Sequence, residues 1–136
     1  MFETFEHTAD LGLRVNSETQ SGLFVDAARG LFSMIVPELT SVECRHSVPI
    51  TLDTDEPDYL LFDWLNELLY LFDAQRLLFS KFEVDIDETG LSALAHGEVY
   101  DPLRHVLEHE VKAITYHGLS LQQVDKRWQA ELIVDI

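Results

Sequence analysis

The chain has 136 residues and a formal charge of −16, with 25 acidic residues against nine basic ones. This length fits a single domain over residues 1–136, and a content of 46% apolar residues is typical of a globular protein rather than a disordered one. The acidic excess argues against direct binding to nucleic acid, which relies on Lys and Arg contacts to phosphates.

The sequence also favours a cytoplasmic protein. No apolar run approaches the roughly 20 residues that a membrane-spanning helix needs, and residues 1–6 lack the basic start and apolar run of a signal peptide. A single cysteine, Cys44, cannot form an internal disulfide, so a reducing compartment is the default. We therefore expect no contact with a membrane.

Two segments have the apolar periodicity of amphipathic helices. The first covers roughly 19–36, where Thr19 or Ser17 is a suitable N-cap. The second covers roughly 56–74, with Asp55 as the predicted N-cap and Pro57 at a position where its missing N–H costs little.

Most of the remaining chain alternates between apolar and polar residues, as strands do. The hairpin turn at 88–90 joins two of these runs, and the turn at 124–126 joins the last two. We therefore predict an α+β fold, a two-layer domain in which two amphipathic helices pack on a mainly antiparallel β-sheet. The predicted strands lie in 11–15, 44–52, 82–86, 91–99, 110–122 and 127–135.

Carboxylates concentrate in the second predicted helix and just before it. Residues 53–73 hold seven carboxylates and no basic residue, and Asp63 and Glu67 stand four apart on the polar face. Like charges at this spacing repel by a few tenths of a kcal/mol. Two explanations stay open: a solvated acidic surface, or a face that meets a basic protein or a cation.

Two further carboxylates stand at strand ends. Asp10 precedes the first predicted strand after residues 7–9, and Asp135 ends the last strand beside Ile136 and its main-chain carboxylate. If the two strands are neighbours, three oxygen donors converge, and such donors suit a hard divalent cation. The sequence thus suggests a cation site formed by Asp10, Asp135 and Ile136.

Other catalytic patterns are weak. His105 and His109 match H-x-x-E-H, a zinc-protease pattern that requires a helix, but Pro102 and the strand-like run that follows leave little room for one. The spacing of His96, His105, His109 and His117 matches no zinc template. Cys44 has no activating motif beside it, and no Gly-rich phosphate loop is present in the sequence.

Six sequence blocks resemble the archease family, in the family's order and over nearly the whole chain. The most specific are the opening block and the central helix. The blocks are FEHTADLG at 5–12, LFS at 31–33, LFDWLNELLYLF at 61–72, GEVYD at 97–101, EVKAITYH at 110–117 and IVDI at 133–136.

This resemblance implies an accessory protein, not an enzyme. Archeases assist the RtcB-family RNA ligase, which uses GTP and manganese to join a 3′-phosphate or 2′,3′-cyclic phosphate RNA end to a 5′-hydroxyl. They promote guanylylation of the ligase histidine and sustain multiple turnover in tRNA splicing and RNA repair. The resemblance implies an activating site of Asp10, Glu67, Lys112 and Asp135, and a divalent cation, calcium or manganese, on Asp10, Asp135 and Ile136.

Two other functions stay open from the residues alone. One is a small metal-dependent hydrolase built on the histidines. The other is a chaperone-like protein-binding module, whose acidic surface serves solubility.

Overall fold

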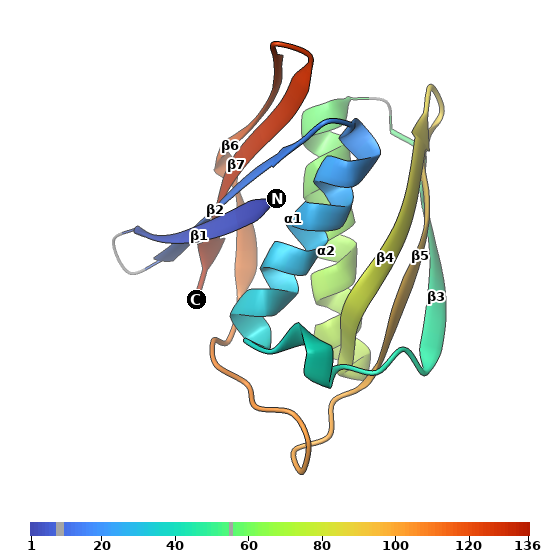
Figure 1. Ribbon diagram of the computed structural model, residues 1–136, viewed down its shortest axis with the longest axis vertical. Coiled ribbons are helices and arrows are strands. Elements are labelled where there is room, and N and C mark those ends of the chain that lie inside the picture. Colours follow the sequence, from blue (N-terminus) through green and yellow to red (C-terminus); the bar gives the residue numbers. More distant parts are fainter. Residues whose placement is uncertain (8–9, 55) are drawn as a thin grey trace.

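Figure 1 presents a computed structural model that describes residues 1–7, 10–54 and 56–136. The described residues form two helices, seven strands and a short 3-10 helix, η1. Their bounds are β1 Phe2–His7, β2 Asp10–Ser17, α1 Gln20–Ile35, η1 Leu39–Ser41, β3 His46–Leu52, α2 Pro57–Gln75, β4 Leu77–Asp87, β5 Gly90–Val99, β6 Ala113–Val124 and β7 Arg127–Asp135.

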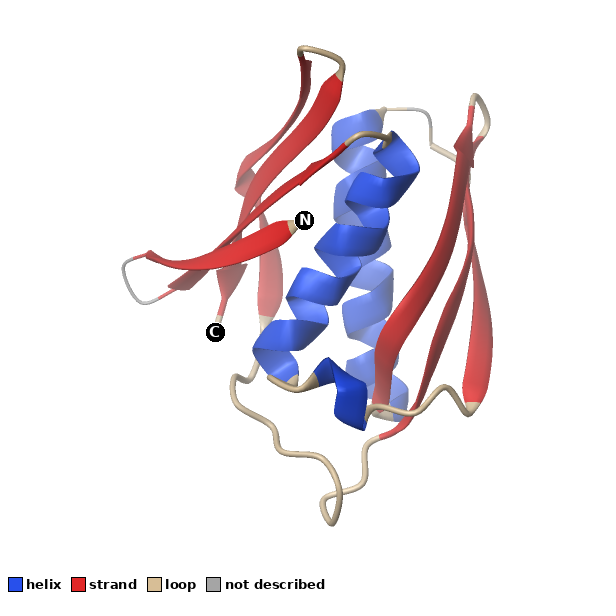
Figure 2. Cartoon of the chain, viewed as in Figure 1, coloured by secondary structure: helices blue, strands red, loops and turns tan. Residues whose placement is uncertain are grey.

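The strands form two antiparallel sheets with the helices between them (Figures 1 and 2). One sheet has the order β1-β2-β7-β6 and the other the order β3-β5-β4. The α+β prediction, two helices on antiparallel sheet, is confirmed. The expectation of a single sheet in two layers is wrong.

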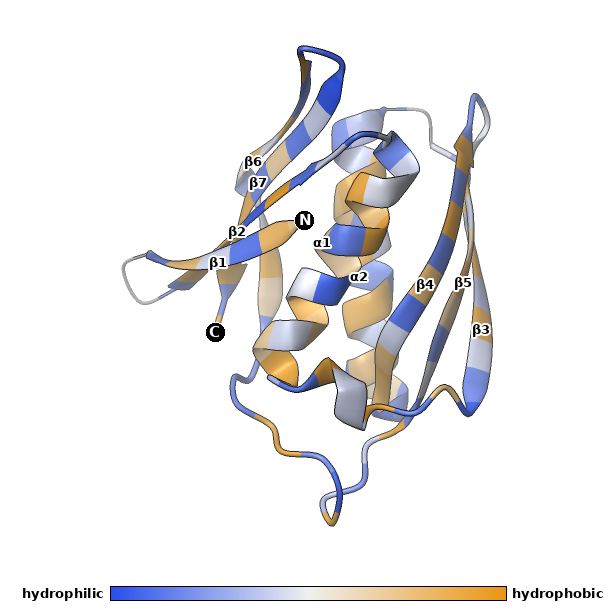
Figure 3. Cartoon of the chain, viewed as in Figure 1, coloured by the Kyte–Doolittle hydropathy of each residue, from blue (hydrophilic) through white to orange (hydrophobic). Residues whose placement is uncertain are grey.

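The physical reason for the second sheet lies in the width of the apolar face of α1. Leu23, Ala27 and Leu31 are fully buried, and so are their neighbours Phe24 and Phe32. A helix with so wide an apolar surface must pack against other elements on more than one side. Accordingly α1 contacts both β2 and β4, which belong to different sheets. In Figure 3 apolar residues recur along both helices.

An aromatic cluster joins the helices to the second sheet. The rings of Trp64 and Phe82 meet edge to face at 6.0 Å between centroids, and those of Phe32 and Phe79 at 5.6 Å. The indole N–H of Trp64 donates a hydrogen bond of 3.0 Å to the carbonyl of Phe24, which ties α2 to α1. This partner explains how a polar indole nitrogen is tolerated in the core.

The predicted helix starts and turns are largely observed. The hydroxyl of Thr19 accepts a hydrogen bond from the Gly22 N–H at 3.0 Å, so Thr19 is the N-cap of α1. Pro57 occupies the first turn of α2, whereas the predicted cap at Asp55 lies outside the described residues. Asp125 and Lys126 both have positive φ, 51° and 68°, as the tight turn between β6 and β7 requires.

No helix of the described residues is long and apolar enough to span a membrane.

Candidate functional site

The predicted convergence of Asp10 and Asp135 rests on the pairing of β2 with β7. These strands are antiparallel neighbours, and Asp10 lies directly opposite Asp135 in the register. Directly opposed residues project from the same face of a sheet, with Cβ atoms about 4.5–5.5 Å apart. Both residues are half-buried. The structure therefore brings together the first and last of the predicted site carboxylates.

Lys112 lies beside the same pair. Its N–H donates a hydrogen bond of 2.8 Å to the carbonyl of Asp135, and the next residue, Ala113, is the register partner of Asp135 on β6. The Lys112 residue is exposed. The flexible, positively charged side chain of Lys112 therefore begins at the same end of the sheet as the two carboxylates. We call this end of the sheet, with Asp10, Asp135 and Lys112, the Asp10–Asp135 edge.

Glu67 is placed separately, on α2. It is half-buried, and within residues 1–7, 10–54 and 56–136 no hydrogen bond or ion pair joins it to Asp10, Lys112 or Asp135. The helix carrying it packs against β6, the strand that follows Lys112. Direct contact among all four predicted residues is therefore not observed.

The chemistry of the Asp10–Asp135 edge suits a hard cation. Two carboxylates directly opposite each other on a sheet place oxygen donors close together, and a hard divalent cation prefers such donors. Ile136, which follows Asp135, would add its main-chain carboxylate. In the described part of the chain no three His, Cys, Asp or Glu side chains form a metal-binding group. The third donor of the predicted set, the main-chain carboxylate of Ile136, stays a prediction.

Extending the chain beyond Ile136 is expected to weaken calcium and manganese binding by about tenfold or more. The extension converts the Ile136 carboxylate into an amide and removes one negative donor. Titration calorimetry with each ion measures the effect, with Asp85→Asn as a control that removes one exposed carboxylate from β4. Equal affinity of the extended and unextended proteins would remove Ile136 from the ligand set.

The H-x-x-E-H segment is not helical and has a different role. It lies in the irregular connection between β5 and β6. His105 is buried; its Nδ1 accepts a hydrogen bond of 2.9 Å from the Asp101 N–H, and its Nε2 lies 3.0 Å from a Glu98 oxygen. Because Nδ1 accepts, Nε2 carries the proton and donates to Glu98. Both ring nitrogens of His105 are hydrogen-bonded within the protein, so His105 is not available as the metal ligand that a histidine-based hydrolase would need.

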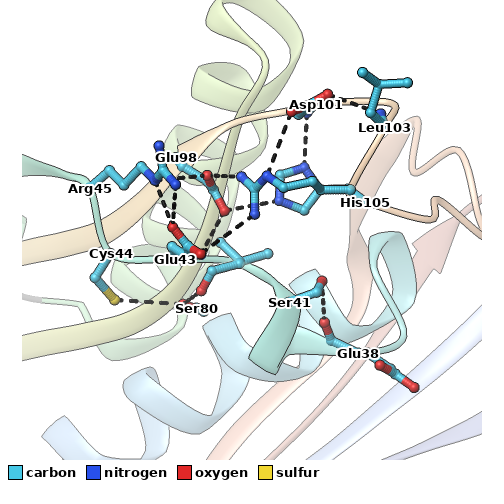
Figure 4. A network of polar contacts seen from close by, with 12 residues as sticks. Glu38, Ser41, Glu43, Cys44, Arg45, Ser80, Glu98, Asp101, Leu103 and His105 are labelled. Atoms are coloured by element: carbon cyan, nitrogen blue, oxygen red, sulfur yellow. Dashed lines mark hydrogen bonds and ion pairs between the residues drawn. The ribbon is translucent and has the colours of Figure 1, made fainter.

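Glu98 is the centre of the polar network in Figure 4. Its carboxylate accepts hydrogen bonds from the Glu43 N–H at 2.7 Å, from His105 and from the guanidinium of Arg104. Burial alone would raise the pKa of Glu98, but these hydrogen bonds outweigh it and lower the pKa from 4.5 to about 2. The sequence gives no local signal for this network, because Glu43 and Glu98 are 55 residues apart.

The network anchors the connection that leads to Lys112. The end of this connection nearer Lys112 is held against α1, where the N–H groups of Glu108 and His109 donate hydrogen bonds to the carbonyls of Ile35 and Met34. Both ends of the segment are therefore fixed before the chain reaches the Asp10–Asp135 edge.

Replacing Glu98 by Gln is expected to lower the free energy of unfolding by about 1–3 kcal/mol at pH 7, because charge-assisted hydrogen bonds are lost. The folded-state pKa is depressed, so this contribution is present above the ordinary value of 4.5 and disappears as the pH falls toward about 2. Urea unfolding of both proteins between pH 7 and pH 3 measures it. A difference that stays constant over this range would contradict the assigned pKa.

Comparison with known proteins identifies the chain. Residues 2–136 match the Archease protein family (MTH1598/TM1083). The chain belongs to the archease family. Archease of Methanopyrus kandleri is 41% identical over 139 residues, covering 99% of each chain, and that of Pyrococcus furiosus is 38% identical over 140 residues, covering 99% of this chain and 98% of its own.

Solved structures agree with this membership. Protein 1598 of Methanobacterium thermoautotrophicum has a TM-score of 0.87 at 33% identity, with 99% of this chain and 98% of that chain covered. An archease of Thermotoga maritima, described as a possible chaperone, has a TM-score of 0.70 at 16% identity, with 100% and 98% covered. The second likeness supports the fold alone. The resemblance inferred from the six sequence blocks is confirmed.

Proposed function

We propose that this archease-family protein activates a GTP- and manganese-dependent RNA ligase of the RtcB family, promoting its guanylylation and multiple turnover in tRNA splicing and RNA repair. The observation that supports this most directly is the edge at which Asp10 faces Asp135 and Lys112 emerges beside them. Opposed carboxylates and a cation together suit a metal–triphosphate complex better than an apolar ligand.

The residues of this edge have separable roles. Asp10, Asp135 and the Ile136 carboxylate would hold a divalent cation, which when bound neutralises charge on phosphate oxygens. Lys112 is exposed and offers a point charge to the same phosphates. Glu67, on the neighbouring helix, would contact the ligase rather than the cation.

The charge of the chain is consistent with an accessory role. At −16 the protein repels nucleotides and RNA, yet complements an enzyme that must carry a basic surface to bind RNA. Such complementarity favours a fast and transient encounter. A transient contact is what activation requires, since a helper that stayed bound would obstruct the RNA.

Ligation with RNA in excess over ligase tests this proposal. We expect product to stop near one equivalent of ligase without the protein and to continue for many equivalents with it. The protein alone should hydrolyse no GTP. Equal product with and without the protein would contradict activation, and GTP hydrolysis by the protein alone would contradict the accessory role.

A chaperone-like module remains the second candidate. Leu103 is 93% exposed and Val106 is 74% exposed, on the segment anchored by Glu98. Exposed apolar residues on a fixed segment suit binding to protein. Suppressed aggregation of an unrelated protein would favour this function, and the ligation assay separates the two.

A further inference from the structure

Exposed tyrosines line the outward face of α2. Tyr59 and Tyr70 are 51% and 61% exposed, and their separation of 11 residues returns to the same face of a helix about 16 Å along its axis. Asp63 and Asp73 are exposed on this face at positions four after Tyr59 and three after Tyr70. The face therefore alternates aromatic rings with carboxylates.

A third tyrosine extends this face onto β6. The ring of Tyr116, 40% exposed, stacks on that of Tyr59 with 5.1 Å between centroids and 6° between planes. Phe62 meets Tyr116 edge to face at 5.2 Å. A hydrogen bond with Tyr59 raises the pKa of Tyr116, and the nearby charges of Asp58 and Glu56 raise it further. We name Tyr59, Tyr70 and Tyr116 with Asp63 and Asp73 the tyrosine face.

Two of the three tyrosine rings, those of Tyr59 and Tyr116, are held in place before any partner arrives. Tyr59 and Tyr116 restrict each other by stacking, and Phe62 of α2 packs edge to face on Tyr116. Tyr70, in contrast, has no hydrogen-bond, ion-pair or ring partner among the residues that the structure describes. Pre-ordered aromatic side chains lose little conformational entropy on binding, which is one reason that tyrosine is enriched at interfaces.

The charge around the tyrosine face selects the partner. No Lys or Arg occurs between Arg45 and Arg76, and seven carboxylates occur within residues 53–73. Nucleic acid and anionic lipid are disfavoured by this charge. A guanidinium group satisfies both parts of the face, because it stacks on aromatic rings and pairs with carboxylates.

We propose that the tyrosine face is the docking surface for arginine side chains on the RNA ligase, an inference that rests on the proposed function for the identity of the partner. The tyrosine face lies beside two of the proposed activating residues, Glu67 on α2 and Lys112 next to β6. Glu67 lies four residues after Asp63 and three before Tyr70, so it neighbours both on the helix surface. Tyr116 lies on β6, the strand that begins directly after Lys112.

Direct binding to purified ligase, measured by calorimetry at low and moderate salt, tests this surface. We expect Tyr59→Ser and Tyr70→Ser each to weaken binding about tenfold, and Asp63→Asn to weaken it less, with a smaller salt dependence. Leu94→Ser removes an exposed apolar side chain from β5, and Asp85→Asn removes an equal charge from β4; both should bind as wild type. Thermal unfolding of each variant verifies that it is folded.

The outcomes separate this inference from the proposed function. If wild type binds the ligase and both tyrosine variants bind as tightly, the tyrosine face is excluded while the proposed function stands. If wild type itself does not bind, both are overturned. If Leu94→Ser weakens binding as much as Tyr70→Ser, the docking surface is not specific to this face and the inference fails.

A peptide titration tests the arginine chemistry directly. We expect a hexa-arginine peptide to shift the ring signals of Tyr59, Tyr70 and Tyr116 in NMR spectra, and to bind several-fold more tightly than a hexa-lysine peptide of equal charge. Equal affinity for the two peptides, or shifts confined to other parts of the chain, would overturn the assignment of arginine as the ligand.

Discussion

Leu68→Ala is expected to lower the free energy of unfolding by about 2–5 kcal/mol, the range for a large-to-small change in a well-packed core. Leu68 is fully buried on α2, one turn after Trp64, which is also fully buried. The helix lies between two sheets, so its neighbours have little freedom to close the cavity. Urea unfolding monitored by tryptophan fluorescence measures the change.

Asp63→Asn is the matched control for this experiment. Asp63 lies on the same helix but is exposed, so its replacement should change stability by less than about 0.5 kcal/mol. Comparable unfolding midpoints for the two variants would mean that the assigned orientation of α2 is reversed.

Asp10→Ala is expected to reduce stimulation of the ligase about tenfold or more, because it removes a proposed cation ligand; losses of this size accompany disruption of metal sites. Lys112→Ala should also stimulate poorly, since its side chain would no longer offset phosphate charge. Transfer of radiolabelled GMP to the ligase at fixed manganese measures both variants.

The control for these variants is binding, since the activating edge and the tyrosine face are different surfaces. Asp10→Ala should dock on the ligase as wild type does but fail to stimulate it, whereas Tyr70→Ser should dock poorly. A folded Asp10→Ala protein that stimulates fully would remove Asp10 from the site, and the same result for Lys112→Ala would remove Lys112.

Local patterns predict the elements of this fold well. Both helices follow from apolar periodicity, with the cap at Thr19 and the proline at Pro57 where expected. The turn at 124–126 follows from its residues and is observed between β6 and β7. The existence of two sheets could not be predicted in this way, because alternation identifies a strand but not its neighbour.

Only the part of the candidate site formed by residues at the ends of strands, Asp10 and Asp135, could be predicted from the sequence. Asp10 and Asp135 converge because β2 pairs with β7, and strand pairing cannot be read from the alternation of a single strand. Glu98 was missed, since its partners come from distant segments and its carboxylate is not part of a motif. His105 was noticed for the wrong reason: it matches a zinc pattern by spacing, yet it is a buried partner of Glu98.

The most direct measurement of the central proposal is the rate of GMP transfer from GTP to the ligase histidine, with this protein present at a small fraction of the ligase concentration. If the protein is an activator that contacts the ligase transiently, wild type should accelerate the formation of the GMP–ligase adduct well beyond its own molar amount. An unchanged rate, in a mixture where the ligase is active and the protein is folded, would contradict the account.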